Sequence, residues 1–393
     1  MKNLFIVFCA CLLIWGCSSS QNGEVHNRMG ETCLFKLVKG ELHNNGATPW
    51  FTEIELGTPK QHMTVMMDTG TSNFWVTSSD CTSKACQTKK FTFDRFSSVS
   101  CDSVPGSGWQ SNDLGSWGEF HSLAVQDTIS FQTTKESENK FKMKFLVAKL
   151  QDAPGSKNWY DLDMCGGIGF PVIFKNPAKT NNPASLLPVL MKMGLVSYPL
   201  ISFWSDQSSG GCLVGGVDSS RFIPHTENII PLTQVATRIN LWTVRLDQFY
   251  KNSSPMLDSP INLALDTGSS RFKGSPEIIN NLISEITEKS DGKHLPTTFT
   301  NAELLNEFPK VTLSINGHQY TLTPQDYIWK IADSPHYSLQ FQPLDIGDDN
   351  TILVGSVFLD HLYSAFVYTA DNSSNYRLKG KYIHLYKREI QYK

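Results

Sequence analysis

Alternation of apolar and polar positions is the main pattern in this chain. Residues 50–56 alternate clearly, and residues 141–150 begin with the same alternation and carry lysines on one face. A period of two predicts a half-buried strand, and the lysine stripe is interpreted as its solvated face. Apolar runs at 63–67 and 261–265 predict buried strands, and residues 351–359 predict a buried strand and turn.

Helical patterns are short. Residues 185–193 predict a helix that ends at Gly194, and residues 275–283 carry apolar residues at a spacing of three to four after a Ser-Pro start. Asn316-Gly317 lies between two strand-like stretches and predicts a hairpin turn. The sequence therefore predicts an all-β fold with a few short helices, in two similar lobes at residues 50–221 and 222–393.

The N-terminal residues follow a different pattern. Met1-Lys2-Asn3 precedes a run of about a dozen apolar residues and then a polar stretch, so residues 1–20 are predicted to be a secretory signal peptide. That run is short for a membrane span. Ile14-Trp15-Gly16-Cys17 leaves a bacterial lipoprotein cleavage site as a minor alternative. Residues 21–49 form a short N-terminal segment with a predicted strand at 33–38.

Composition narrows the class of partner. The chain has 393 residues, 40% hydrophobic and 18% charged, which is typical of a globular protein. The formal net charge is −3 at pH 7, so we expect neither nucleic acid nor, once the signal is removed, a membrane as partner. The ten histidines show no metal-ligand spacing.

Six cysteines follow the predicted signal. In a secreted chain they favour disulfides over metal ligands. Cys81 and Cys86 flank a short loop and are predicted to pair, whereas the sequence leaves three pairings open for Cys33, Cys101, Cys165 and Cys212. Asn252 and Asn372 each begin an Asn-Ser-Ser glycosylation pattern, which implies exposed loops on a secretory route.

Two copies of one short motif carry the candidate chemistry. Asp68-Thr69-Gly70-Thr71-Ser72 follows the apolar run 63–67, and Asp266-Thr267-Gly268-Ser269-Ser270 follows 261–265. A single Asp-Thr-Gly is most often an ordinary turn, but two copies in matching contexts indicate a duplicated fold. Each motif places a carboxylate at the end of a buried strand.

Two such carboxylates brought together favour acid–base hydrolysis. Like charges at about 3 Å cannot both ionise cheaply, so one proton is shared between them. The ionised carboxylate then takes a proton from a water while the protonated partner polarises a carbonyl group. Asp68 and Asp266 are therefore the predicted catalytic pair, with no cofactor and no metal.

The residues after each aspartate are predicted to support it. Gly70 and Gly268 permit close approach of one backbone to the other. We expect the hydroxyls of Thr69 and Thr267 to bond to backbone of the opposite turn. Those of Thr71 and Ser269 are expected to donate to the outer carboxylate oxygens.

The sequence resembles the pepsin-like aspartic endopeptidases over about residues 50–386. The resemblance rests on the two Asp-Thr-Gly turns, on Trp75, on Leu56-Gly57-Thr58-Pro59 and on the Cys81/Cys86 loop. Gly215-Gly216-Val217-Asp218 resembles the lobe junction. The element that cradles each turn is assigned to Leu353-Val354-Gly355 and, in degraded form, to Cys165-Gly166-Gly167. The resemblance implies a bilobal β fold and an extended polypeptide bound in the cleft between the lobes.

Three departures from the family pattern stand out. The flap tyrosine position falls on Gly115, and no tyrosine occurs between Val76 and Trp159, so Trp117 is the candidate substitute. Too few residues precede the first matching strand for a full-length basic pro-segment. Ser356 occupies the place of the acidic residue that is common after the second cradle element.

The leading hypothesis is an active, monomeric aspartic endopeptidase in the secretory pathway, either secreted or lysosomal. The alternative is a catalytically impaired relative that binds peptides, and it is motivated by the flap and the pro-segment. A metal held between the paired carboxylates is a remote third reading, because divalent ions need more oxygen ligands than two turns supply.

Overall fold

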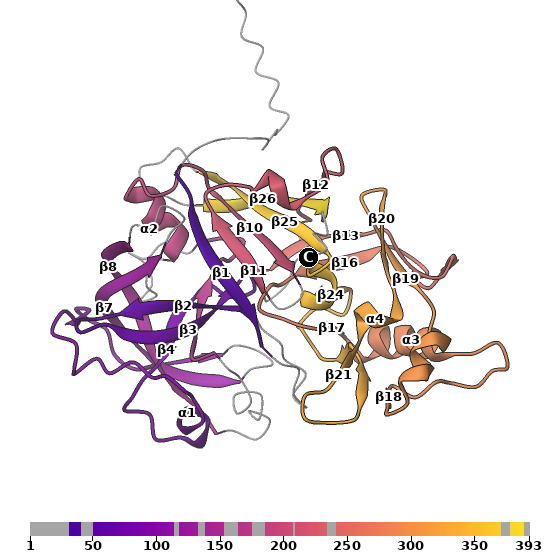
Figure 1. The fold of residues 1–393 in the computed structure, drawn as a ribbon, viewed down its shortest axis with the longest axis horizontal. Helices are drawn as coiled ribbons and strands as arrows, with labels where there is room; N and C mark the ends of the chain where they lie inside the picture. The colour runs from indigo at the N-terminus through magenta and orange to yellow at the C-terminus, as the bar shows by residue number, and fades with distance from the viewer. Residues whose placement is uncertain are drawn as a thin grey trace, which may run out of the picture.

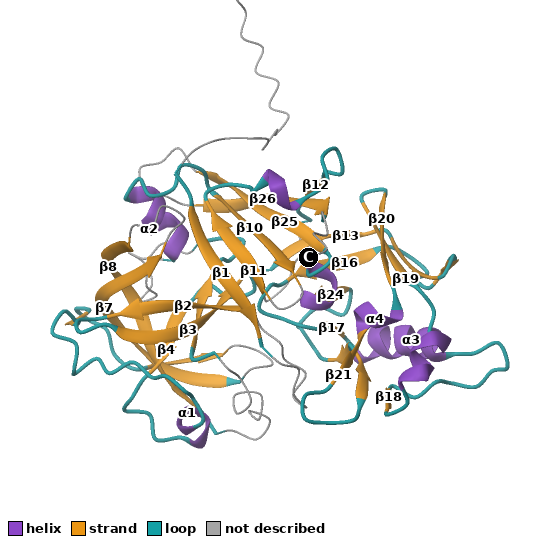
Figure 2. Cartoon of the chain, in the orientation of Figure 1, coloured by secondary structure: helices purple, strands orange, loops and turns teal. Residues whose placement is uncertain are grey.

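The computed structural model describes residues 31–40, 50–113, 118–132, 138–152, 164–174, 185–206, 209–233, 241–370 and 378–388. Strands dominate these residues, and the helices among them are short (Figure 2). The all-β class predicted from the sequence is confirmed.

A large sheet runs through the molecule and includes strands from both ends of the chain (Figure 1). Its order is β12-β26-β25-β10-β11-β1-β2-β3-β9-β4-β8-β7-β5, and β6 pairs with β7. Its strands are β1 (Cys33–Lys39), β2 (Trp50–Leu56), β3 (Gln61–Asp68), β4 (Phe74–Thr77), β5 (Asp102–Ser103), β6 (Gln110–Asp113), β7 (Glu119–Gln132), β8 (Glu138–Leu150), β9 (Gly166–Gly169), β10 (Leu200–Asp206), β11 (Ser209–Val214), β12 (Asn228–Pro231), β25 (Leu362–Ala370) and β26 (Leu378–Lys387).

Three smaller sheets build most of the C-terminal half, on the right of Figure 1. The first contains β13 (Trp242–Leu246), β16 (Ile261–Leu265), β24 (Thr351–Val354), β17 (Phe272–Gly274) and β23 (Phe341–Pro343). The second contains β15 (Ser254–Pro255), β14 (Gln248–Lys251), β19 (Val311–Ile315) and β20 (His318–Leu322). The third contains β18 (Thr298–Phe299), β22 (Tyr337–Leu339) and β21 (Ile328–Lys330).

The helices connect strands. They are α1 (Lys84–Gln87), α2 (Leu186–Lys192), α3 (Pro276–Thr287), α4 (Pro324–Tyr327) and α5 (Ser356–Leu359), with 3-10 turns η3 (Ser219–Arg221) and η4 (Ala302–Glu307). Both predicted helices are confirmed, as α2 and α3. The hairpin predicted at Asn316-Gly317 joins β19 and β20, and both turn residues have positive φ.

The same strand arrangement occurs once in each half. In the N-terminal half, β3 pairs antiparallel with β2 and parallel with β9, and β4 lies antiparallel to β9. In the C-terminal half, β16 pairs antiparallel with β13 and parallel with β24, and β17 lies antiparallel to β24. The stretch just after β3 or β16 therefore meets the end of a parallel strand in both halves.

Contacts around Asp360 tie the first strand to the C-terminal half. The Lys39 ammonium forms an ion pair with Asp360, and Trp50 Nε1 donates to the same carboxylate at 2.7 Å. The strand predicted at 33–38 is thus part of the central sheet, between β11 and β2. The lobe boundary at residues 221 and 222 stays a prediction, because β10 of the first half pairs with β25 of the second.

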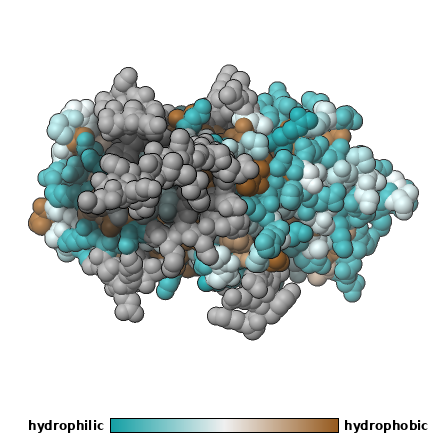
Figure 3. All heavy atoms as spheres, turned by 90° about the horizontal axis from the view of Figure 1, so that it is seen from above, coloured by the Kyte–Doolittle hydropathy of each residue, from teal (hydrophilic) through white to brown (hydrophobic). Residues whose placement is uncertain are grey.

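The exposed surface is mixed. In the view from above, the right-hand part, where the C-terminal half lies, is mostly hydrophilic with scattered hydrophobic residues (Figure 3). Among the described residues, no helix has the length and apolar character needed to cross a membrane.

Candidate functional site

Asp68 and Asp266 occupy matching positions. Asp68 is the last residue of β3, opposite Gly169 of β9, and Asp266 directly follows β16. The Asp266 N–H donates to the Val354 carbonyl at 3.0 Å, which continues the pairing of β16 with β24 by one residue. The Asp68 side chain is buried. The parallel strand beside each aspartate thus fixes the direction of its backbone.

The two turns cross closely, and this brings the two carboxyl groups together. A Cβ atom placed on Gly70 would lie 2.6 Å from Cγ of Asp266, and one placed on Gly268 would lie 2.5 Å from Cγ of Asp68. Side-chain carbons do not approach other atoms so closely, so glycine is required at both positions. The Gly70 N–H donates to Asp68 Oδ1 at 2.6 Å, and the Gly268 N–H donates to Asp266 Oδ1 at 2.9 Å.

Thr69 and Thr267 join the turns by reciprocal hydrogen bonds. The Thr69 N–H donates to Thr267 Oγ1, and the Thr267 N–H donates to Thr69 Oγ1, both at 3.0 Å. Each hydroxyl then donates to a carbonyl of the opposite half, Thr69 to Leu265 at 3.2 Å and Thr267 to Met67 at 2.7 Å. Both threonines are buried, so four hydrogen bonds shielded from water fix the relative position of the two aspartates.

The next hydroxyl residues do not act as the sequence suggested. Ser269 Oγ is buried and has no hydrogen-bond partner among the described residues. The Thr71 hydroxyl accepts from the Asn73 N–H at 3.4 Å, and the contact of Thr71 with Asp68 is made by its backbone N–H. The expected donation from Ser269 is therefore wrong, and that from Thr71 is replaced by a backbone bond.

The cradle element of the first half is displaced by two residues from its predicted place. Asp68 lies opposite Gly169, and a Cβ on Gly169 would lie 2.4 Å from the Thr71 carbonyl oxygen. In the second half, a Cβ on Gly355 would lie 1.9 Å from the Ser269 carbonyl oxygen. The counterpart of Leu353-Val354-Gly355 is thus Gly167-Ile168-Gly169. The assignment to Cys165-Gly166-Gly167 was wrong because three glycines in four residues fit more than one register.

Burial and mutual repulsion control the ionisation of the pair. Burial is the main cause that raises the pKa of Asp68 well above its usual value, and the charge of Asp266 adds to it. Burial also raises the pKa of Asp266, but a hydrogen bond from Asp68, the Lys273 ammonium and backbone N–H groups oppose that rise. The surroundings therefore favour the shared proton on Asp68 and the negative charge on Asp266.

Two cations just after the second Asp-Thr-Gly turn were not predicted from the sequence. Lys273 lies in β17, is buried, and interacts electrostatically with both aspartates. Arg271 precedes β17, and its Nε donates to Gln340 Oε1 at 3.1 Å. Their positions just after the second Asp-Thr-Gly turn, on either side of Phe272, were the signal that could have identified them.

Trp75 of β4 packs against β7. Its ring stacks on Phe120 of β7 with 5.5 Å between centroids, and a Cβ on Gly167 would lie 3.0 Å from its Nε1. Gly115 and Trp117, the flap position and its candidate substitute, lie outside the described residues. The role of Trp117 stays a prediction.

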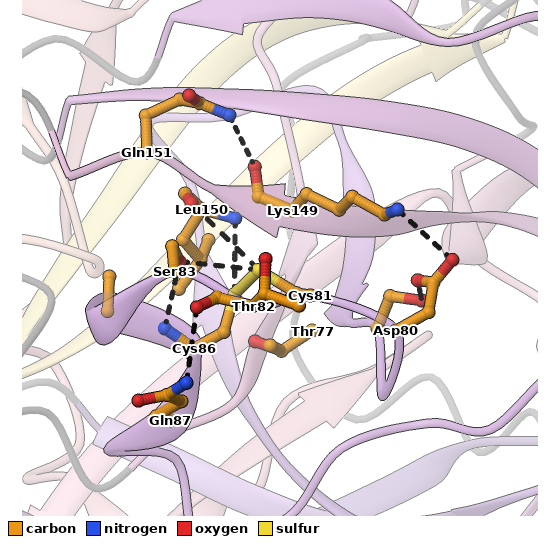
Figure 4. Close-up of a disulfide and its surroundings, with 12 residues drawn as sticks. Thr77, Asp80, Cys81, Thr82, Ser83, Cys86, Gln87, Lys149, Leu150 and Gln151 are labelled. Carbon is orange, nitrogen blue, oxygen red and sulfur yellow. Dashed lines mark hydrogen bonds and ion pairs between the residues drawn. A yellow bond between two sulfur atoms is a disulfide. The ribbon is translucent and has the colours of Figure 1, made fainter.

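Cys81 and Cys86 form a disulfide that closes a short loop at α1 (Figure 4). Beside it, Lys149 of β8 forms an ion pair with Asp80 at 3.1 Å. The other four cysteines, Cys33, Cys101, Cys165 and Cys212, are free thiols, so the expected further disulfides are wrong. Cys33 and Cys212 lie on paired strands but oppose Val214 and Phe35 respectively, which keeps them diagonal to one another.

The two predicted glycosylation sites differ in what the structure describes. Asn252 is exposed at a turn between β14 and β15, where it has a positive φ of 52°. Its Oδ1 accepts from the Lys310 N–H at 3.2 Å. Asn372 lies outside the described residues. An exposed turn suits a glycan, and glycosylation of both sites stays a prediction.

Other candidate ligand sites are sparse. In the described parts of the chain, no group of three or more His, Cys, Asp or Glu side chains is placed to hold a metal ion. A small pocket borders Thr267 and Ser356, but its lining comes mostly from the central sheet and includes neither catalytic candidate; it is formed by Leu37, Trp50, Phe203, Trp204, Ser205, Thr267, Ser356, Leu359 and Asp360.

Comparison with known proteins gives consistent matches. A family model described as "Eukaryotic aspartyl protease" matches residues 49–375. Pepsin A of Sus scrofa is 26% identical over 332 residues, which cover 83% of this chain and 80% of the relative. Cathepsin E-A of Xenopus laevis is 29% identical over 81% of this chain and 76% of its own length. Cathepsin E of Mus musculus is 28% identical over 86% of this chain and 83% of its own length.

Proposed function

The chain belongs to the eukaryotic aspartyl protease family, and from that premise we propose that it is an active aspartic endopeptidase. The pepsin-like bilobal fold implied by the sequence is confirmed with the family. Its proposed substrate is a polypeptide bound in extended form across the paired aspartates, and no cofactor takes part. One observation carries the proposal: Asp68 and Asp266 come together across two turns that only glycine at positions 70 and 268 permits.

The proposed reaction needs one proton shared by the pair. Asp266, ionised, accepts a proton from a water molecule as the water oxygen attacks the scissile carbonyl carbon. Asp68, protonated, donates its proton to the carbonyl oxygen, which yields a neutral tetrahedral diol. Asp266 then gives its proton to the leaving nitrogen as the carbon–nitrogen bond breaks, and Asp68 takes a proton back from the diol. No covalent bond to the enzyme forms.

The surroundings support these roles. Burial makes full ionisation of both carboxyls unfavourable, and Asp68 bears the larger elevation of pKa. Lys273 and the N–H groups of Gly268 and Gly70 stabilise negative charge on Asp266. The four threonine hydrogen bonds hold the pair in place without consuming a carboxylate oxygen.

We also propose that the enzyme works as a monomer in the secretory pathway, secreted or lysosomal. The signal-like start of the chain and the Cys81–Cys86 disulfide support an oxidising compartment.

The test is cleavage of an unfolded protein by the purified chain between about pH 2 and pH 8, with and without pepstatin. Wild type is expected to cleave, and Asp68→Asn and Asp266→Asn to lose cleavage by at least about 10³-fold, since each removes a member of the acid–base pair. Asp258→Asn, an exposed site, serves as the matched control. A folded chain that binds pepstatin but cleaves nothing across that range would reject the proposal in favour of a peptide-binding relative.

A further inference from the structure

Asp360, which directly follows α5, accepts bonds from distant parts of the chain. Its carboxylate accepts from the Lys39 ammonium, at the end of β1, at 2.5 Å and from Trp50 Nε1, at the start of β2, at 2.7 Å. Its carbonyl accepts from Ser205 Oγ of β10 at 3.0 Å and from the Arg388 guanidinium, just after β26, at 2.5 Å. Three strands of the first half therefore reach this one residue of the second half.

The ion pair between Lys39 and Asp360 is largely shielded from water. The two side chains are 21% and 16% exposed, respectively. The Lys39 ammonium also lies 4.4 Å from the ring centroid of Trp329 in β21 and 5.7 Å from that of Trp50, which suits cation–π contacts with both rings. Solvent and salt weaken such a pair less than a surface pair, so it holds the two halves in a defined position.

Asp360 ends the short helix that holds the second catalytic turn. Its N–H donates to the Ser356 carbonyl at 3.0 Å and so closes α5. At the start of α5, the Ser356 N–H donates to the Ser269 carbonyl at 3.0 Å, and the Val357 N–H donates to the carbonyl of the next residue at 2.9 Å. Both carbonyls belong to the turn that begins with Asp266. A shift of α5 therefore shifts the backbone of this turn.

Packing is incomplete between α5 and the first half. A cavity of about 20 Å³, which is room for about one water molecule, is lined by residues of both halves. Leu37 and Trp50 line it from the first half, and Thr267, Leu359 and Asp360 line it from the second. Side chains that face a gap lose van der Waals contacts across it. The directional bonds of Asp360 therefore contribute more to the position of α5 than they would beside a filled interface.

We propose that Asp360, held by Lys39 and Trp50, is a positioning residue for catalysis, which fixes the turn of Asp266 relative to the first half of the molecule. It acts through α5 and not by contact with the substrate. The inference rests on the proposed function, because the reaction needs Asp266 at a defined place beside Asp68 and the attacking water. A misplacement of about 1 Å at such a site costs up to about 100-fold in rate.

A loosened second turn is expected to change the ionisation of the pair. The Gly268 N–H lowers the pKa of Asp266, because it donates to the carboxylate at 2.9 Å. Weakening of this bond raises the pKa of Asp266, while the other groups that act on it, Asp68, Lys273 and the Gly70 N–H, stay in place. The acid limb of the kcat/KM profile reports this ionisation and therefore moves to higher pH. A loss of stability alone does not move this limb.

The experiment compares variants of the ion pair, each shown by circular dichroism to be folded. Lys39→Met and Asp360→Asn each remove one charge and are expected to lower kcat about tenfold, to leave KM within about twofold and to move the acid limb upward. The double variant is expected to lose no more than the worse single variant, because both changes break the same bond. Lys39→Arg keeps the charge and is expected to retain most of the activity. Glu307→Gln, which breaks an exposed ion pair with Lys289, is the matched control.

Amide hydrogen exchange separates this inference from the proposed function, because it needs no substrate. The Ser356 and Val357 N–H groups are expected to exchange at least about tenfold faster in Lys39→Met than in wild type, and at the wild-type rate in Glu307→Gln. If wild type cleaves nothing but the exchange rates differ in this way, the proposed function fails and the positioning of the turn stands. Unchanged exchange at these two amides overturns the inference whether or not cleavage occurs. An active enzyme whose kcat and acid limb are the same in Lys39→Met as in wild type overturns it as well.

Discussion

The reciprocal bonds between Thr69 and Thr267 give the sharpest prediction on stability. Thr267→Val keeps the shape of the side chain but removes the hydroxyl that accepts from the Thr69 N–H and donates to the Met67 carbonyl. Both backbone groups are then left buried without a partner. Each such group costs about 1–3 kcal/mol, so we expect the free energy of unfolding to fall by about 2–6 kcal/mol. Thr69→Val is expected to cost a similar amount, since it removes the symmetric pair of bonds.

The assay is urea unfolding followed by tryptophan fluorescence, with kcat measured on the same preparations. Thr267→Ser retains the hydroxyl and is expected to lose about 1 kcal/mol, from one buried methyl group. Thr77→Val is the comparison for a buried hydroxyl whose loss leaves no group unpaired, because the Cys165 carbonyl that accepts from Thr77 Oγ1 at 2.9 Å also accepts from the Thr77 N–H at 2.7 Å. We expect a loss of only about 1 kcal/mol and an unchanged kcat. If Thr267→Val loses less than Thr77→Val, the threonine pair does not hold the turns together.

Three further predictions concern the aspartate pair and the thiols. Gly70→Ala places a methyl group 2.6 Å from Cγ of Asp266, so kcat is expected to fall at least about 100-fold. Gly108→Ala is the control, because a Cβ atom at Gly108 meets no other atom within 4 Å. Equal activities of the two variants would contradict the close contact between the two Asp-Thr-Gly turns. In the chain without its signal, thiol titration under denaturing, non-reducing conditions is expected to count four groups. In the native state half-buried Cys101 is expected to react first but slowly, because burial raises its pKa to about 11. A count of two groups or fewer would show that further disulfides form. Burial raises the pKa of Asp68, so above the usual pKa of an aspartate the unfolded chain releases this proton more readily and the folded state loses stability. Asp68→Asn removes the titrating group and is therefore expected to stabilise the fold at pH 7 but not at about pH 3.5, by about 1.4 kcal/mol for each pH unit by which the pKa is raised. An effect on urea unfolding that does not change with pH would refute this.

The sequence was sufficient to predict the elements with strong local patterns. Asp68 and Asp266 follow strand-like apolar runs that proved to be β3 and β16, and Asn316-Gly317 has the local sequence of a hairpin turn. These predictions needed no knowledge of distant residues. The repeated motif also predicted that the two halves meet at these turns, because two matching turns at matching strand ends can pair symmetrically.

The errors came where a distant partner decides the outcome. Cys33 and Cys212 were expected to pair somewhere, but strand register places each against an apolar neighbour. The glycines at 166, 167 and 169 gave no local preference for one register, and the crowding of Gly169 against Thr71 decided it. Nothing in the local sequence marked Lys273 as a buried cation, and its burial follows from its place in β17, opposite Leu353 of β24. None of these partners is near in sequence.

The pairing of β10 with β25 has a consequence for the growing chain. β10 ends at Asp206, and β25 is complete only at Ala370. At about 5–20 residues per second, the ribosome needs about 10–30 s to supply the missing strand. During that interval β10 has one edge without a neighbour, which is a template for pairing with other chains. The large sheet therefore cannot be completed until β25 has been synthesised, and correct folding of the first half depends on protecting the free edge of β10 from other chains until then.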